Sequence, residues 1–112
     1  MALGITSTQD ANTPSIIAGN GSTGVTVLAY NAARIGFSIQ NVGTTTAWIR
    51  IDGNQAGSLA SSTVYHYAIH GGSSDNDGTG GSISFFGVTV PTGLVTMYGA
   101  STAKVTALEI AP

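Results

Sequence analysis

Apolar and polar residues alternate most regularly in the part of the chain between Arg34 and Gly53. A period of two is typical of a β-strand that buries one face and exposes the other. The alternation is interrupted once, at residues 41–45, so it predicts two strands joined by a short polar turn as a hairpin. The predicted core consists of the large apolar residues that share one phase of this pattern. These are Ile35, Phe37, Ile39, Ile49 and Ile51.

Shorter apolar runs elsewhere predict six more strands between turns rich in Gly, Asn and Pro. The runs cover residues 15–18, 24–30, 63–70, 82–87, 94–99 and 104–110. About eight short strands at this spacing predict an all-β fold, a two-sheet antiparallel β-sandwich of the jelly-roll kind. Loop 53–62 is long enough to cross from one sheet to the other. The Gly- and Asp-rich segment 71–81 is expected to be an exposed, mobile loop.

The domain organisation follows from the length and from the first residues. A chain of 112 residues has the size of one domain. Residues 1–14 are mostly small or polar and end in Asn12-Thr13-Pro14. They predict an N-terminal arm before a single sandwich domain at residues 15–112. An arm of this kind is able to lie on a neighbouring subunit.

The composition argues against several classes of function. Only 7% of residues are charged and the formal net charge is −2, so no basic surface for nucleic acid is expected. The chain has no cysteine, which excludes disulfides and thiolate metal sites. No run of about 20 apolar residues is present to span a membrane, and the first residues lack the features of a signal peptide. The protein is therefore expected to be made as a soluble product in the cytoplasm.

Two short motifs match enzyme signatures as strings but not in their chemistry. Residues 19–24 match the dinucleotide-binding string G-x-G-x-x-G. β-Branched residues follow where a helix N-terminus must bind the pyrophosphate, so a turn is predicted. Residues 101–104 match the S-x-x-K string of penicillin-recognising enzymes, but a strand directs its first and fourth residues to opposite faces. No spacing pairs a nucleophile with a base, so the sequence predicts no enzyme and no catalytic residue.

The histidines and the acidic residues are the candidate metal ligands of this chain. His66 and His70 are four residues apart, which on a strand separates them by about 13 Å, too far to share a zinc ion. An ion shared across a symmetry axis is the alternative.

Residues 75–78, Asp-Asn-Asp-Gly, resemble the start of a calcium loop, but the acid required at position 12 is replaced by Phe86. The segment predicts a flexible turn, with a weak calcium site as the alternative. No metal and no cofactor are predicted.

Four side chains are candidates for contact with a partner. Trp48 and Arg50 share the face opposite the predicted core residues, and both residue types are enriched at binding hot spots. Leu28 and Tyr30 share one face of the predicted strand 24–30. The predicted interface residues are therefore Leu28, Tyr30, Trp48 and Arg50. In the alternative, the register is shifted and Trp48 is simply part of the core.

Several segments of the chain resemble small bacteriophage virion proteins, the capsid-associated β-sandwich group of decoration (cement) proteins and minor head proteins. They are residues 31–41 and 47–53, an aromatic strand at 65–69, the Gly-rich loop after it, and the closing residues 104–110. The resemblance implies a non-enzymatic structural subunit, often a homotrimer, that binds the major capsid protein and stabilises the shell against internal DNA pressure. It also implies a location on the capsid surface of the virion, after synthesis in the host cytoplasm.

Two other classes of binding protein are compatible with the same residues. A carbohydrate-binding module would use Trp48, Tyr65, Tyr67 or Tyr98 as a stacking platform for sugars. A receptor-binding spike or fibre head is the other alternative. Glycan binding that is lost on Trp48→Ala would favour the carbohydrate-binding module.

Overall fold

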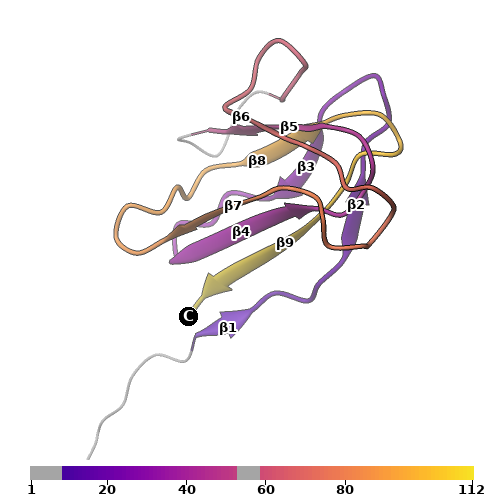
Figure 1. Ribbon diagram of the computed structural model, residues 1–112. Coiled ribbons are helices and arrows are strands. Elements are labelled where there is room, and N and C mark those ends of the chain that lie inside the picture. Colours follow the sequence, from indigo (N-terminus) through magenta and orange to yellow (C-terminus); the bar gives the residue numbers. More distant parts are fainter. Residues whose placement is uncertain (1–8, 53–58) are drawn as a thin grey trace, which may run out of the picture.

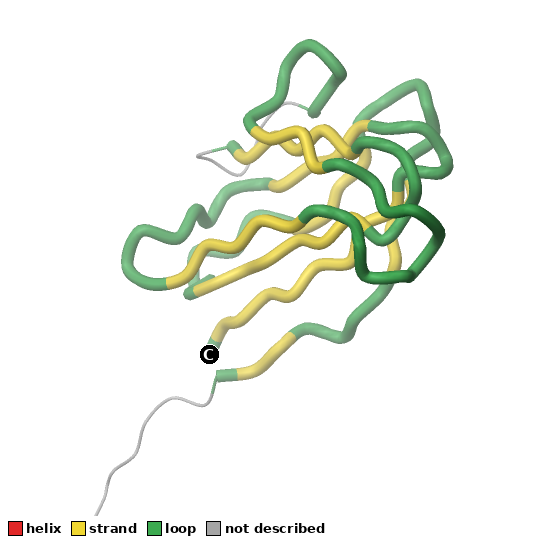
Figure 2. Tube along the Cα trace, viewed as in Figure 1, coloured by secondary structure: helices red, strands yellow, loops and turns green. Residues whose placement is uncertain are grey.

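The computed structural model describes residues 9–52 and 59–112 (Figure 1). These residues form nine β-strands joined by loops and turns, and no helix occurs among them (Figure 2). The strands are β1 (Asp10–Ala11), β2 (Ile16–Ala18), β3 (Val25–Leu28), β4 (Gly36–Asn41), β5 (Ala47–Ile51), β6 (Tyr67–Ile69), β7 (Ser82–Phe86), β8 (Val95–Tyr98) and β9 (Lys104–Ala111). The predicted all-β class is therefore confirmed.

The strands form two antiparallel sheets that pack as a sandwich (Figure 1). One sheet has the order β2-β9-β4-β7, with β1 also paired to β9, and the other has the order β3-β8-β5-β6. Four strand pairs follow one another along a long antiparallel ribbon, which is rolled up so that successive pairs alternate between the two sheets. These pairs are β2–β9, β3–β8, β4–β7 and β5–β6. This is the strand order of a jelly roll, so the predicted architecture is confirmed.

The predicted hairpin at residues 34–53 is wrong, because its two strands lie in different sheets. β4 pairs with β7 and β9, whereas β5 pairs with β6 and β8. Alternation shows that each strand has one apolar face, but two such strands can either pair side by side or face each other across a core. Here they face each other, and residues 42–46 cross between the sheets.

The buried side chain of Asn41 stabilises this crossing. Its Nδ2 donates to the carbonyl oxygens of Thr45 at 2.8 Å and Ile69 at 2.9 Å. Its Oδ1 accepts a hydrogen bond from the backbone N–H of Gly43 at 3.0 Å. The side-chain amide thus provides hydrogen-bond partners for backbone groups that have no partner strand where β4 ends. A turn can be buried between two sheets only if its backbone groups are hydrogen-bonded in this way.

The connection after β5 is long enough to cross between the sheets but does not do so. β5 and β6 are neighbours in one sheet, so the connection returns to the sheet from which it starts. Residues 53–58 of the predicted loop 53–62 lie outside the described residues. β6 is shorter than the predicted strand 63–70, because Ser61 and Val64 bond to each other through their backbones in a turn, at 3.0 and 3.3 Å.

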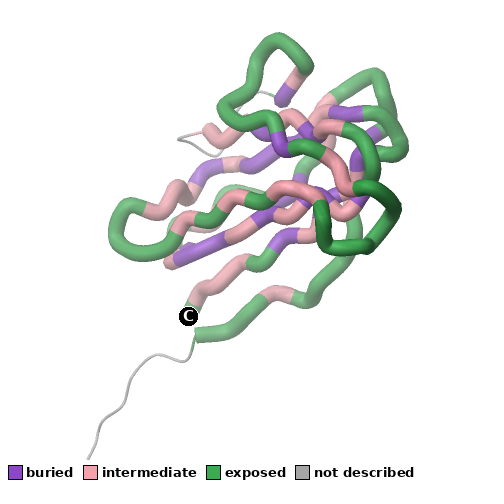
Figure 3. Tube along the Cα trace, in the orientation of Figure 1, coloured by how far each residue is buried: buried purple, intermediate pink, exposed green. Residues whose placement is uncertain are grey.

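The core lies between the inner faces of the two sheets (Figure 3). Phe37, Ile39 and Ile49 are fully buried, as predicted, whereas Ile35 and Ile51 are only partly buried near the ends of their strands. β8 and β9 supply most of the remaining core. The other core residues are Val27, Leu28, Ala47, Ile69, Val95, Met97, Ala103, Val105 and Ala107.

Part of the predicted N-terminal arm belongs to the chain's own five-stranded sheet. β1 pairs with the end of β9, with Asp10 opposite Ala111. Asn12 extends the pairing, because its backbone N–H donates to the Glu109 carbonyl oxygen at 3.1 Å and its side-chain Oδ1 accepts from the Glu109 N–H at 2.7 Å. Residues 1–8 of the predicted arm lie outside the described residues.

Candidate functional site

The outer face of the four-stranded sheet carries the predicted pair Trp48 and Arg50. Trp48 lies between Tyr98 of β8 and Ala68 of β6 in the sheet register, and its side is opposite that of the buried Ile49. The alternative in which Trp48 belongs to the core is therefore wrong. The rings of Trp48 and Tyr98 are 5.9 Å apart and inclined by 48°. Together they form a partly exposed aromatic pair, which we call the Trp48–Tyr98 pair.

Arg50 lies on the same face but is already engaged within the chain. Its Nε donates to Oδ1 of Asp52 at 3.2 Å, and the two side chains are 24% and 14% exposed. Its neighbour across the sheet, Thr96, is buried, and its hydroxyl accepts a hydrogen bond from the backbone N–H of Ala60 at 2.9 Å. Arg50 therefore offers a partner only part of its hydrogen-bonding capacity.

Leu28 is not an interface residue, which corrects the prediction. The pairing of β3 with β8 shifts between Thr26 and Leu28, so Val27 is an extra residue in a β-bulge. A bulge reverses the phase of the alternation beyond it. Leu28 therefore points into the core, where it is 7% exposed, whereas Tyr30 remains 41% exposed beyond the end of β3.

The predicted interface residues do not form one patch. Along β5, Trp48 is opposite Tyr98 near one end of the sheet, and Ile51 is opposite Val95 near the other. Tyr30 follows β3 beyond this second end, because Leu28 is also opposite Val95. The structure therefore brings Trp48 together with Tyr98 and Arg50 and separates all three from Tyr30.

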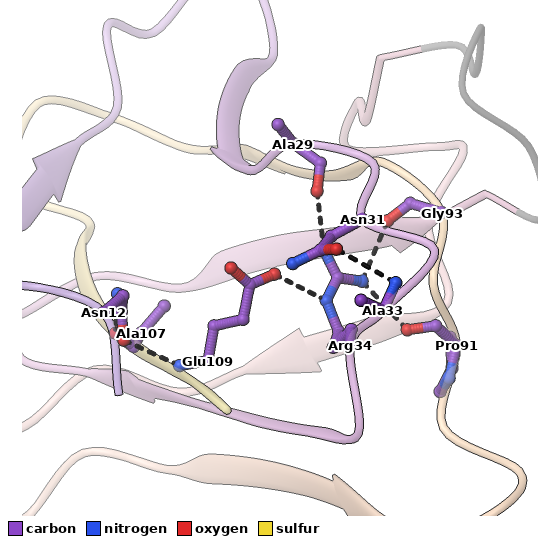
Figure 4. A network of polar contacts seen from close by, with 9 residues as sticks. All are labelled: Asn12, Ala29, Asn31, Ala33, Arg34, Pro91, Gly93, Ala107 and Glu109. Carbon is purple, nitrogen blue, oxygen red and sulfur yellow. Dashed lines mark hydrogen bonds and ion pairs between the residues drawn. The ribbon is translucent and has the colours of Figure 1, made fainter. Parts of the chain in front are cut away.

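Arg34 forms a buried polar network that sequence reasoning missed (Figure 4). Its guanidinium donates to Glu109 Oε2 at 2.7 Å and to the carbonyl oxygens of Ala29 at 2.6 Å, Pro91 at 2.8 Å and Gly93 at 3.0 Å. Only 2% of the residue is exposed, and its charge also lies 5.2 Å from the ring centroid of Phe37. One side chain thus ties two loops to β9. The feature of the sequence that could have indicated this network is a single Arg directly before the most apolar strand.

Exposed apolar side chains are concentrated on two parts of the surface. One group lies on the outer face of the five-stranded sheet and in the turn after β7, and the other lies on the connection before β6 and in β6 itself. The first group consists of Ile16, Phe86, Val88 and Leu108, and the second of Leu59, Val64, Tyr65 and Tyr67. The first group was missed because Phe86 was predicted only as part of the strand 82–87, and Val88 lies outside the predicted strands.

An open groove of about 620 Å³ adjoins the first group. It lies where β4 begins and where β7 and β9 end. Its lining is mainly apolar and comprises Gln9, Ile35, Phe86, Gly87, Val88 and Ile110. We call it the Phe86 groove.

Loop 71–81 is exposed, as predicted, but it has extensive internal hydrogen bonding. The carboxylate of Asp77 accepts from the N–H and hydroxyl of both Thr79 and Ser74. These bonds, with the Thr79 hydroxyl first, lower the pKa of Asp77 to about 2. Asp75 pairs with Lys104 at 3.0 Å. The oxygens proposed for calcium are therefore occupied by groups of the protein.

His66 is also hydrogen-bonded within the chain. Nδ1 of His66 accepts the backbone N–H of Ile51 at 2.9 Å, which assigns the proton to Nε2 in the neutral ring. Within the described residues, no group of three or more His, Cys, Asp or Glu side chains is arranged to hold a metal ion. In the same part of the chain, no helix has the length and apolar character needed to cross a membrane.

Comparison of the chain with models of known protein families, with curated proteins and with solved structures finds no match.

Proposed function

We propose that this protein is a structural component of a bacteriophage virion that binds the major capsid protein on the outside of the shell and stabilises it. The observation that supports a binding role is a difference between the environments of its polar and its apolar side chains. Polar groups such as those of Arg34 and Asn41 form internal hydrogen bonds, while large apolar groups such as those of Trp48 and Phe86 remain partly accessible. Apolar area of this kind is stabilised when a partner covers it.

The assignment to a capsid rests on the sequence resemblance and on an analogy of fold. Viral capsid proteins and lectins both use jelly rolls, so the architecture is compatible with a capsid role without selecting it. A rigid sandwich with no cysteine can fold in a reducing cytoplasm and then add to a shell that is already assembled. Repetition of one weak contact over many lattice sites gives tight overall attachment.

The Trp48–Tyr98 pair is the proposed contact with the major capsid protein. An aromatic pair held on a sheet loses little conformational freedom when it is covered, which favours its use as an anchor. Arg50, beside it on β5, adds a charged group at the rim of the contact. The protein is proposed to act as a homotrimer, so that three such anchors bind at once.

The test is co-sedimentation with empty shells assembled from the major capsid protein of the phage genome that carries this gene. The wild-type protein should pellet with the shells, and Trp48→Ala should weaken binding by about 2 kcal/mol, or about 30-fold. Tyr65→Ala is the matched control, because it removes an exposed aromatic residue from another surface and should bind normally. Absence of the wild-type protein from the pellet at micromolar concentration would contradict the proposal.

One observation favours a carbohydrate-binding module as the second candidate. The Trp48–Tyr98 pair presents two aromatic rings on an accessible face, as sugar stacking requires. Tyr67 does not extend it into a platform, because its ring contacts Phe85 on the opposite side of the sheet, with centroids 5.8 Å apart. A glycan array decides the matter: specific binding that Trp48→Ala abolishes would support the module over the capsid contact.

A further inference from the structure

β7 forms an edge of its sheet and, within residues 9–52 and 59–112, has a partner strand on one side only. At one end of this pairing the N–H of Gly87 donates to the carbonyl oxygen of Ile35 at 3.2 Å, and at the other the N–H of Asn41 donates to that of Gly81 at 2.9 Å. Hydrogen-bonded pairs alternate with non-bonded pairs along an antiparallel ladder. The residues of β7 whose backbone N–H and C=O groups point to the open edge are therefore Ser82, Ser84 and Phe86.

Among the described strands, the other edges of the two sheets carry features that hinder pairing with a further strand. β3 contains the bulge at Val27, β6 is only three residues long, and the edge formed by β1 and β2 is interrupted by Pro14. β7, in contrast, has five residues in unbroken register with β4. No charged residue occurs between Asp77 and Lys104. A regular, uncharged edge of this kind is a template for pairing with another strand.

Apolar side chains lie on both faces of the sheet at this edge. Phe86 is 54% exposed on the outer face and lines the Phe86 groove together with Val88 of the next turn. On the inner face, the ring of Phe85 contacts Tyr67 of β6, the edge strand of the other sheet. An open pocket of about 250 Å³ adjoins these two rings. A strand added to β7 would therefore cover apolar surface in addition to pairing its backbone groups.

The sequence of β7 is complementary to itself when two copies run antiparallel. With a two-fold axis at Ser84, this residue is opposite Ser84 of the second copy, and the three edge-facing residues of each copy all form hydrogen-bonded pairs. Phe86 is then opposite the smaller Ser82 of the second copy. Phe85 is opposite Ile83 of the second copy, and an aromatic residue opposite a β-branched one stabilises a sheet. Because β7 has no charge, the axis brings no like charges together.

We propose that β7 pairs with β7 of a second copy of this chain, antiparallel and centred on Ser84, so that the two five-stranded sheets continue into one another. The pairing is two-fold, so it is a different contact from the one that closes the proposed homotrimer. Where both contacts form, it joins two trimers. It does not depend on binding to a capsid, so it stands or fails separately from the function proposed above.

The absence of cysteine from the chain allows a direct test by disulfide formation between copies. In the proposed pairing the Cα atoms of the two Ser84 residues are about 5.5 Å apart, a distance that a disulfide can bridge. Ser82→Cys is the matched control, because it makes the same substitution at another exposed position of the same strand. Its two copies would be offset along the strands by four residues, or about 13 Å, which is too far for a disulfide. After mild oxidation at one protein concentration, Ser84→Cys should give about tenfold more linked dimer than Ser82→Cys.

Two results would overturn the proposal. Equal yields for Ser84→Cys and Ser82→Cys would mean that the linked copies met at random and that the edge is free or pairs with a strand of another protein. A higher yield for Ser82→Cys would mean that the copies meet in another register.

Light scattering on Ser84→Lys gives a second readout. The Ser84 side chain is exposed, and the two-fold pairing would place two lysines opposite each other, where like charges repel. Ser84→Lys should therefore halve the mass of the wild-type protein at micromolar concentration, with an unchanged far-UV circular dichroism spectrum. Thr26→Lys, at an exposed position of the edge strand β3, is the control and should keep the wild-type mass. Equal masses for the wild-type protein and Ser84→Lys would contradict the pairing.

Discussion

Replacement of Arg34 by Met should destabilise the fold more than any surface substitution. Met is of similar length but provides no hydrogen-bond donors, so Arg34→Met leaves three carbonyl oxygens unbonded and leaves the Glu109 carboxylate, 19% exposed, without its cation. Removal of one partner of a buried ion pair costs about 3–5 kcal/mol. A domain of this size is stable by only about 5–15 kcal/mol, so the loss is a large share of the total.

The assay is urea unfolding followed by circular dichroism at one fixed protein concentration. With a slope of about 2 kcal/mol/M, a loss of about 4 kcal/mol lowers the midpoint by about 2 M urea. Glu109→Gln is the comparison, because its side-chain oxygen can still accept from Arg34 Nε, and it should cost about 1–2 kcal/mol. A midpoint change below about 0.5 M for Arg34→Met, at unchanged slope, would refute the view that this network holds the loops to β9.

Three further outcomes are expected. Asn41→Ala should lower the free energy of unfolding by about 2–3 kcal/mol in the same assay, because backbone groups at the crossing lose their partners; a loss equal to that of an exposed Asn, such as Asn20→Ala, would contradict this. Leu28→Ala truncates a core side chain and should lower the free energy of unfolding in urea by about 2–4 kcal/mol. Tyr30→Ser should change it by less than about 0.5 kcal/mol. A larger loss of stability for Tyr30→Ser than for Leu28→Ala would contradict the core position of Leu28. The hydrogen bonds to Asp77 lower its pKa from 3.8 to about 2, so its contribution to stability is complete above pH 3.8 and is lost as the pH falls toward 2. Asp77→Asn should remove this part of the acid dependence of stability, which thermal unfolding measures between pH 5 and pH 2. An identical pH dependence in the wild-type protein and in Asp77→Asn would contradict this prediction.

The alternation of side chains was sufficient to identify the class of fold and much of the core. A strand places successive side chains on opposite faces, so the phase of an apolar run can be read from neighbouring residues alone. For this reason Phe37, Ile39 and Ile49 were predicted as core residues and are buried. The same local rule placed Trp48 on the outer face of its strand, which the structure confirms.

The pairing of strands could not be read in this way, because the period is the same whichever neighbour a strand has. β4 pairs with β7 and not with β5, and the choice depends on rolling the whole ribbon so that both apolar faces meet. Leu28 shows the limit at a single residue, since one bulge, visible only in the register with β8, reverses its side. The contact of Arg34 with Glu109 likewise joins residues far apart in the sequence. Local periodicity therefore determined which faces are buried, and long-range packing determined which strands, loops and charges meet.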